Sequence, residues 1–534
     1  MPPISTTDSD NKPIRRVKYK RGLILLALQA SLFLSALDGT IVSTSLPRIG
    51  SDFNEFTIAL WVANAYNLAY GAFLPLFGSC NDIFGRKCTL LAGIGFFLVG
   101  SVLCGVASSM IMLIICRSIA GIGASAIYSA VFVIISEMAP LDKRGSYHGL
   151  INAVYAMASI FGPLVGVGIC LRRELLTLTY LLRTHTHTGR FHRLSQLAMV
   201  LLYQYDMDTP KSIDYAGILL LIPSVTLFLL ALNFGGSMYP WQSIEVLVPL
   251  VLSVVFCCGF IVIECKFAHN PILPPRLFKN QSIVATLLTD WMFGTCMFAF
   301  VFNFPLYLQV IQGNSAMWSG IHLIPMQLAI CISSTVAGLL ISISKSYRPG
   351  LWIGMVLLGC LIGLIAIFGI TTPYYLIYIV TVIGGIGLGA LFSSTIISLQ
   401  AAAEPKDIST VTCLNHLIIV LGGSVGLAIA NSVLTARLIA DLPSAVPFEY
   451  IQPIVKSSLF VRQGLPPQYQ EAALQVYSQS LRMVWYSMMP FAVVGLISSA
   501  FVKHCNLQST DSSQLNNTGT DTPKCNDEII NATA

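Results

Sequence analysis

Two ionisable side chains stand inside apolar runs that are long enough to cross a membrane. Asp38 lies near the middle of the run 22–46, and Arg117 lies in the first half of the run 110–136. A charge in hydrocarbon is costly, so such residues face a polar cavity or pair with an opposite charge. A carboxyl group in these surroundings could bind and release a proton. The structural alternatives are a hydrogen-bonding group at a kink near Pro47 and a fixed bridge between helices.

A short charged segment, GSCNDIFGRK, separates two further apolar runs and holds Gly78, Asp82, Gly85, Arg86 and Lys87. Asp82 could stabilise the positive end of a facing helix, with Arg86 holding it in place. Gly78 would allow a close approach of two helices, and Gly85 would allow the turn. A plain basic loop is the alternative, and it accounts for Arg86 and Lys87 but not for the position of Asp82.

The composition requires membrane-spanning helices to position these residues. The chain has 534 residues, of which 55% are hydrophobic and only 10% are charged, whereas about 25% are charged in an ordinary soluble domain. The net charge of +6 indicates basic cytoplasmic loops rather than affinity for nucleic acid. No phosphate-binding loop, nucleophile constellation or paired-cysteine metal motif is present, so we expect neither an enzyme nor a cofactor or metal. We therefore predict an all-α polytopic membrane protein.

Thirteen apolar runs have the length of a membrane span, which is about 20 residues. They are 22–46, 57–79, 88–107, 110–136, 146–170, 215–235, 244–264, 283–308, 319–342, 350–371, 374–399, 410–435 and 482–503.

Lys and Arg mark cytoplasmic loops, and this rule exposes a gap in the count. The basic residues at 86–87 and 143–144 place residue 170 outside, whereas those at 266–279, 345–348 and 406 require residue 214 to lie inside. One more crossing is needed within 171–209, but the apolar pieces there are short and are separated by arginines and by His185, His187 and His192. We interpret this segment as a gene-model error or as a genuine but degenerate helix. Its histidines lack the carboxylates or cysteines of a metal site.

Several stretches resemble motifs of the major facilitator superfamily, in particular its fourteen-helix drug:proton antiporters of fungi. They are LDGTIVSTSLP (37–47), GSCNDIFGRK (78–87), RSIAGIGAS (117–125), FGPLVGVG (161–168), DYAGILLLIPSVTLFLLALNFGGSMYPW (214–241), FPLYLQVIQGNSAMWSGIHLIP (304–325), GGIGLGALFSS (384–394) and LGGSVGLAIA (421–430). The chain departs from the family pattern at Leu74, Val167 and Ile419, where a Gln, a Gly and an Arg are common.

The resemblance implies a major facilitator fold, with two six-helix bundles and two inserted helices. It also implies roles for individual residues. Asp38 and Arg117 would couple transport to protons, and the segment 78–87 would latch the two halves. Gly162, Pro163 and Gly166 would bend the fifth span as in the family's antiporter motif, with ordinary helix packing as the alternative.

The implied function is proton-coupled efflux of hydrophobic drugs or secondary-metabolite toxins by alternating access. The alternatives are an importer of a small nutrient, a membrane sensor built on a transporter fold, and a non-transporting member with a disrupted sixth helix. The expected partners are a small-molecule substrate, protons and the lipid bilayer, and we expect a monomer. We expect the plasma membrane, with the vacuolar membrane as the alternative.

The expected organisation has five parts. A cytoplasmic tail (1–21) precedes an N-terminal bundle (22–209), whose part 171–209 is atypical. An inserted helix pair with its cytoplasmic loop (210–280) leads to a C-terminal bundle (281–503) and a disordered tail (504–534). The external loop 436–481 is expected to contain a short amphipathic helix on the membrane surface. Asp290, near the start of the run 283–308, is interpreted as an interfacial residue rather than as a coupling site.

Overall fold

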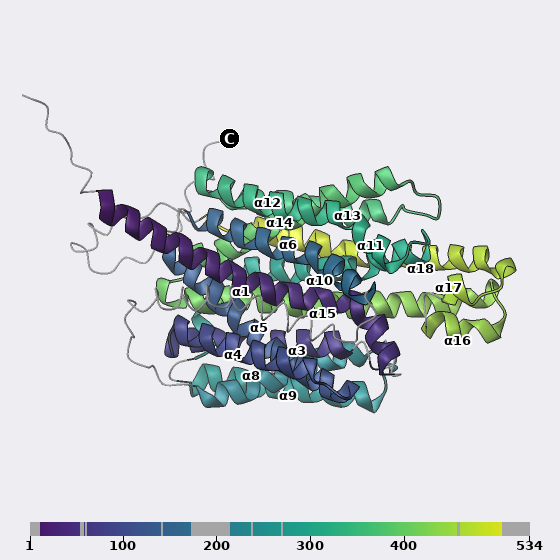
Figure 1. Cartoon of the computed structure of the whole chain (residues 1–534), viewed down its shortest axis with the longest axis horizontal. Coiled ribbons are helices and arrows are strands. Elements are labelled where there is room, and N and C mark those ends of the chain that lie inside the picture. Colours follow the sequence, from purple (N-terminus) through teal and green to yellow (C-terminus); the bar gives the residue numbers. More distant parts are fainter. Residues whose placement is uncertain are drawn as a thin grey trace, which may run out of the picture.

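The computed structural model describes residues 11–53, 58, 61–139, 143–171, 214–236, 239–268, 271–456 and 460–504. These residues form long helices that run roughly parallel to one another (Figure 1). Eleven of the helices in these ranges are long and apolar enough to cross a membrane. Within the same ranges the only β pairing is one isolated bridge between Gly235 and Tyr239. The expected all-α membrane fold is therefore confirmed.

Thirteen helices of spanning length occur among the described residues, and each overlaps one of the thirteen predicted runs. They are α1 (Asn11–Asp52), α3 (Trp61–Ile83), α4 (Arg86–Gly105), α5 (Met110–Met138), α6 (Arg144–Leu171), α8 (Tyr215–Phe234), α9 (Ile244–Lys266), α10 (Gln281–Val310), α12 (Ile324–Ser344), α13 (Arg348–Ile365), α14 (Tyr374–Ala402), α15 (Ile408–Asp441) and α18 (Pro467–Ala500).

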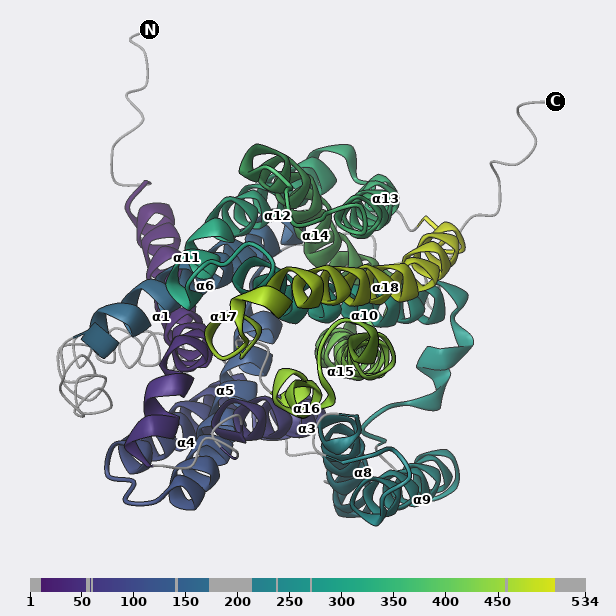
Figure 2. The same ribbon diagram turned by 90° about the vertical axis from the view of Figure 1, so that its right-hand side faces the viewer.

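The long helices form two bundles. Helix α5 packs between α3 and α4, and α1 packs against α6, in the N-terminal half. In the C-terminal half, α10 packs against α15 and α18, while α14 packs against α12 and α13. The two halves meet where α6 lies along α12 and where α3 and α5 lie along α15 (Figure 2).

Helices α8 and α9 form a separate antiparallel pair beside the bundles (Figure 2). Only α8 touches the bundles extensively, through α3 and α15. Helix α8 begins at the side chain of Asp214, which accepts a hydrogen bond from the Gly217 N–H at 2.9 Å. Most of the surface of α9 is left exposed, as expected for a helix that faces lipid on several sides.

Two basic segments that connect the long helices lie on the same side of the membrane, because an ion pair joins them. After α9, the short 3-10 helix η2 (Pro275–Lys279) carries Arg276, whose Nη2 lies 2.8 Å from Asp407 Oδ1 at the start of α15. The Asp407 hydrogen bond raises the pKa of the Arg276 guanidinium, so this bridge between two basic loops keeps its charge. Both loops therefore lie on one side of the membrane, as their Lys and Arg content predicts.

Helix α6 ends at Leu171, and α8 begins at Tyr215. The predicted degenerate crossing within 171–209 falls between them. Apart from residue 171, which closes α6, this segment and its three histidines lie outside the described residues.

The region 436–481, which is predicted to be an external loop, contains more helix than expected. Helix α15 continues to Asp441, followed by η4 (Leu442–Ser444), α16 (Phe448–Lys456) and α17 (Phe460–Gln463). The stretch predicted as a separate surface helix is instead the first half of α18. This helix has 34 residues and thus a length of about 51 Å, against about 30 Å of hydrocarbon. Its polar half extends beyond the bundle with α16 and α17 (Figure 1), because Pro467 stands at the first helical position and residues 468–481 contain neither Pro nor Gly.

Candidate functional site

Asp38 of α1 and Arg117 of α5 form a buried ion pair. Arg117 Nη1 lies 2.6 Å from Asp38 Oδ2, and only 5% of the Arg117 side chain and 12% of the Asp38 side chain are exposed. Arg117 Nε also donates to the Val62 carbonyl of α3 at 3.3 Å. The pair therefore joins three helices of the N-terminal bundle, and the structure brings together the two residues that the sequence singled out.

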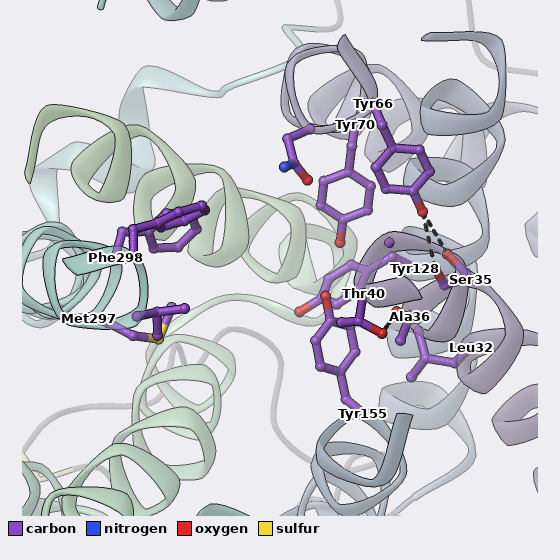
Figure 3. A pocket seen from close by; sticks show the side chains of 14 residues that line it. Leu32, Ser35, Ala36, Thr40, Tyr66, Tyr70, Tyr128, Tyr155, Met297 and Phe298 are labelled. Carbon is purple, nitrogen blue, oxygen red and sulfur yellow. Dashed lines mark hydrogen bonds between the residues drawn. The ribbon is translucent and has the colours of Figure 1, made fainter. Parts of the chain in front are cut away.

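Tyr66 of α3 covers this ion pair. The guanidinium carbon of Arg117 lies 4.3 Å from the centre of the Tyr66 ring, which is a cation–π contact. The Tyr66 hydroxyl donates to the Ser35 carbonyl of α1 at 3.2 Å (Figure 3). Gly121 makes this packing possible, because a Cβ at that position would collide with the Tyr66 carbonyl oxygen. Tyr66 is consequently tied both to the pair and to the helix that carries Asp38.

A cavity of about 250 Å³ lies on the other side of Tyr66 and between the two bundles. Residues of α1, α3, α5 and α6 line one wall, and residues of α10 line the other (Figure 3). The lining residues are Leu32, Ser35, Ala36, Gly39, Thr40, Tyr66, Asn67, Tyr70, Tyr128, Tyr155, Met297, Phe298, Val301 and Phe302. None of these side chains carries a formal charge at neutral pH. The cavity thus combines a tyrosine-rich wall with an apolar wall.

Gly162 supports the first wall through its contact with Thr40. Gly162 of α6 faces Thr40 of α1 so closely that a Cβ at Gly162 would overlap the Thr40 side chain. The Thr40 hydroxyl donates to the Ala158 carbonyl of α6 at 3.3 Å. Pro163 and Gly166 also lie in α6, but their surroundings are outside the described part of the structure. The proposed bend at these residues stays a prediction.

The charged segment 78–87 forms the turn between α3 and α4. Gly85 has a φ of 82°, the left-handed region that favours glycine, and Lys87 is the second residue of α4. Gly78 lies against α15, where an added Cβ would be 3.0 Å from Cys413 Sγ. The geometry therefore agrees with the turn and the close approach expected of the two glycines.

The partner of Arg86 is one that sequence reasoning missed. Arg86 Nη2 lies 3.4 Å from Asp82 Oδ1 but only 2.5 Å from Glu137 Oε1 at the end of α5. Arg86 Nε donates to the same carboxylate at 2.9 Å. The sequence offered one indication of this contact: Glu137 is a carboxylate at the end of an apolar run, shortly before the basic residues Lys143 and Arg144. Arg86 thus links the turn to α5 as well as holding Asp82.

Polar contacts close the cytoplasmic half of the interface between the bundles. Ser409 of α15 donates to the Gly78 carbonyl of α3 at 2.9 Å, and Ser129 Oγ of α5 lies 3.0 Å from Cys413 Sγ. Gln400 of α14 donates to Ser136 of α5 at 2.8 Å. Such contacts between separate bundles can break when the bundles move apart.

Close backbone packing of α6 on α12 adds to this closure. A Cβ on Gly149 would lie 2.8 Å from Thr335 Cα, and one on Gly145 would collide with the Gly338 carbonyl oxygen. The Thr335 hydroxyl donates to the Gly149 carbonyl at 3.2 Å. Small residues at such contacts let helix backbones approach closely within a membrane.

The interpretation of Asp290 as an interfacial residue is wrong. Its side chain is fully buried where α10 packs against α14 and α15. The Asn415 amide donates to Asp290 Oδ2 at 2.7 Å. A carboxyl near the start of an apolar run suggests an interface, but the run alone does not show which face of the helix is packed.

Comparisons with known proteins agree on one family. Residues 29–174 match the Major Facilitator Superfamily. An uncharacterised MFS-type transporter of Schizosaccharomyces pombe is 30% identical over 508 residues, which covers 93% of this chain and 83% of the relative. An MFS-type efflux pump of Arthroderma benhamiae is 29% identical and covers 90% of each chain. The human organic anion transporter MFSD10 superposes with a TM-score of 0.56 at 12% identity, over 91% of this chain and 99% of that chain, which supports the fold.

Proposed function

This chain belongs to the major facilitator superfamily, and on that basis we propose that it exports hydrophobic or amphipathic compounds in exchange for protons. It is an integral, multi-pass membrane protein and a transporter of small molecules, not an enzyme. The direction of transport, the coupling ion and the substrate class are the parts that we propose. The curated relatives named efflux pumps support the direction.

The cavity between the bundles carries the proposal. Ligand sites are mostly apolar and aromatic with a few polar groups that orient the ligand, and this cavity has that character. The volume of about 250 Å³ suits a compact aromatic compound. A charged sugar acid would need a charged side chain, and the lining has none. This lining favours a hydrophobic substrate over the importer alternative.

The neighbouring ion pair supplies the proposed proton coupling. Asp38 lies between Leu37 and Gly39, and Gly39 and Ser35 both line the cavity. When Asp38 takes up a proton, Arg117 loses its charged partner and retains the Val62 carbonyl and the Tyr66 ring. Because Tyr66 also lines the cavity, its rearrangement would change the cavity shape. Proton binding and substrate binding would then oppose each other, as antiport requires.

Alternating access would arise from rocking of the two bundles around this midplane cavity. In the structure the cytoplasmic half of the interface is closed by contacts such as those of Ser409 with Gly78 and of Gln400 with Ser136. Asp82, Arg86 and Glu137 lie at the edge of this closure. We propose that this charged cluster latches the cytoplasmic side until the bundles separate.

Dye exchange in proteoliposomes tests the function. Purified protein is reconstituted into vesicles with an acidic interior, and uptake of rhodamine 6G is followed by fluorescence. We expect uptake that stops when nigericin collapses the pH gradient. Asp38→Asn and Arg117→Lys should abolish gradient-driven uptake, whereas Asp214→Asn, which changes a helix-capping carboxylate outside the cavity, should not.

Each alternative predicts a different result. An importer of a polar nutrient would leave the dye untransported. A non-transporting protein would show no exchange of either dye or protons in any variant. Unchanged proton-driven uptake in both Asp38→Asn and Arg117→Lys would remove these residues from the mechanism. We further propose that the protein acts as a monomer in the plasma membrane, which fluorescence microscopy of a tagged chain can distinguish from the vacuolar membrane.

A further inference from the structure

A second carboxyl group, Asp290, lies in the C-terminal bundle without a charged partner. It is fully buried in α10, where the Asn415 amide donates a 2.7 Å hydrogen bond to Oδ2 and Thr395 of α14 is a second, uncharged hydrogen-bonding neighbour. Its Oδ1 has no hydrogen-bond partner. Among the described residues no Lys, Arg or His forms an ion pair with it. This setting differs from that of Asp38, which faces Arg117 directly.

The difference matters because an ionised carboxylate without a cation is expensive to bury, whereas the neutral acid is not. A membrane-embedded carboxyl of this kind faces a pathway or takes part in proton transfer more often than it serves packing. The unpartnered Oδ1 is the atom on which a proton would reside, since Oδ2 already accepts the Asn415 amide.

Helix α15, which carries the hydrogen-bond partner of Asp290, also contacts the N-terminal bundle. On α15, Asn415 points to Asp290 and the next residue, His416, points to α3 and α5. His416 Nε2 lies 3.1 Å from the Tyr70 hydroxyl, and its ring centre lies 4.2 Å from that of Tyr128. Successive helical residues are separated by about 100°, so α15 presents one residue to each side of the interface.

Tyr70 and Tyr128 both line the cavity. Movement of α15 away from the N-terminal bundle would break the His416 contact with Tyr70 and alter the enclosure of Asp290. The environment of the acid is thereby connected to the opening and closing of the cavity.

The surrounding titratable groups are few. Helix α14 contributes the uncharged Thr395, and the charged residues of α18, Glu471 and Arg482, lie in its external half. Tyr128 of α5 interacts electrostatically with Asp290, and α15 carries the titratable Cys413 and His416 beside Asn415. None of these three is a permanent cation, and among the described residues neither Arg117 of α5 nor Arg437 of α15 forms an ion pair with Asp290.

We propose that Asp290 is a second proton-binding site, which holds a proton in the enclosed state and releases it when α15 moves. This inference rests on the proposed proton-coupled export and extends it to two protons for each substrate. The bond that breaks on release is the carboxyl O–H of Asp290, and the proton passes to water that enters as the interface opens.

Infrared spectroscopy of the purified protein tests the site without any substrate. At neutral pH the protein that carries Glu264→Gln, which removes another buried carboxyl group without an ion partner, should show a C=O stretching band of a protonated carboxylic acid that shifts in D₂O. All further substitutions are made in this background. The band should disappear in Asp290→Asn and persist in Asp38→Asn. Thr289→Val, which alters a buried neighbour on the same helix, should keep the band. Asp290→Glu should retain the band at a shifted frequency. This variant keeps a carboxyl group at the site, so it separates loss of the acid from loss of the fold.

Rhodamine 6G exchange gives the second readout, with the membrane potential clamped at zero. For a pH difference of one unit, net flux should stop at a dye gradient of ~100-fold with two exchanged protons and ~10-fold with one. We expect Asp290→Asn to lower the wild-type limit about tenfold. A band that survives in Asp290→Asn, or an unchanged limiting gradient, would overturn the proposal. If the band is lost in Asp290→Asn but the wild type exchanges no dye, the result would support protonation of Asp290 and contradict the proposed export.

Discussion

Replacement of Gly149 by alanine tests whether the packing of α6 on α12 holds the cytoplasmic side closed. The added Cβ would lie 2.8 Å from Thr335 Cα and 2.9 Å from the Ser334 carbonyl oxygen. Both are backbone atoms of α12, so the conflict cannot be relieved by a side-chain rotation. The two bundles must separate by a few tenths of an ångström or more.

The magnitude follows from the cost of overpacking, which is about 1–3 kcal/mol. The conflict exists only while α6 and α12 are in contact, so this free energy disfavours the closed state and not the open one. The population of the cytoplasm-open state should therefore increase ~5- to ~150-fold. Loss of the Thr335 hydrogen bond to the Gly149 carbonyl acts in the same direction.

Cys413 provides the assay, because it is buried between α15 and the N-terminal bundle beside Ser129. The rate at which a polar maleimide labels Cys413, measured by peptide mass spectrometry, should rise by the same factor. Gly95→Ala is the matched control, since a Cβ there meets no atom within 4 Å. An unchanged Cys413 labelling rate in folded Gly149→Ala would show that this contact does not hold the gate.

Three further outcomes follow from the contacts. Asp38→Asn and Arg117→Met should each lower the free energy of unfolding by about 3–5 kcal/mol, because either leaves a buried group unpaired. The double variant should lose much less stability than the sum of the two single losses. Additive losses in thermal unfolding would contradict the pairing. Glu137→Gln should cost only about 0.2–1 kcal/mol, since its pair with Arg86 is partly exposed, yet should shift Cys413 labelling if the cluster is a latch. Arg462→Ala should lower the free energy of unfolding by about 1.5–3 kcal/mol, because Arg462 donates hydrogen bonds to backbone carbonyls at the C-terminal end of α10. An unchanged melting temperature would count against a stabilising role for these bonds.

The spans were predictable from the chain alone. All thirteen predicted apolar runs coincide with helices, because hydrocarbon requires each crossing to satisfy its own backbone hydrogen bonds over about 20 residues. The prediction failed at 466–481, where amphipathic character suggested a surface helix. Residues 467–481 form the first half of α18 instead, since no Pro or Gly between residues 468 and 481 interrupts this helix.

The candidate site was predicted in part. The sequence identifies Asp38 and Arg117 as candidate functional residues because ionisable residues are rare in apolar runs. It also offers their pairing as one possible arrangement. It does not indicate that Tyr66 covers the pair, that Glu137 is a partner of Arg86, or that Asp290 is fully enclosed. Each of these depends on which helix faces are in contact.

By itself, therefore, the sequence determined how many apolar helices the described chain contains and which charged residues lie within them, and it predicted which loops are cytoplasmic. These properties depend on local hydropathy and on the positions of Lys and Arg. Only the tertiary structure decided which faces meet, where the cavity lies, and that Asp38 is paired while Asp290 is not. The physical reason is that lipid tails are as apolar as leucine side chains. An apolar helix therefore carries little pattern to distinguish the face that meets lipid from the face that meets another helix.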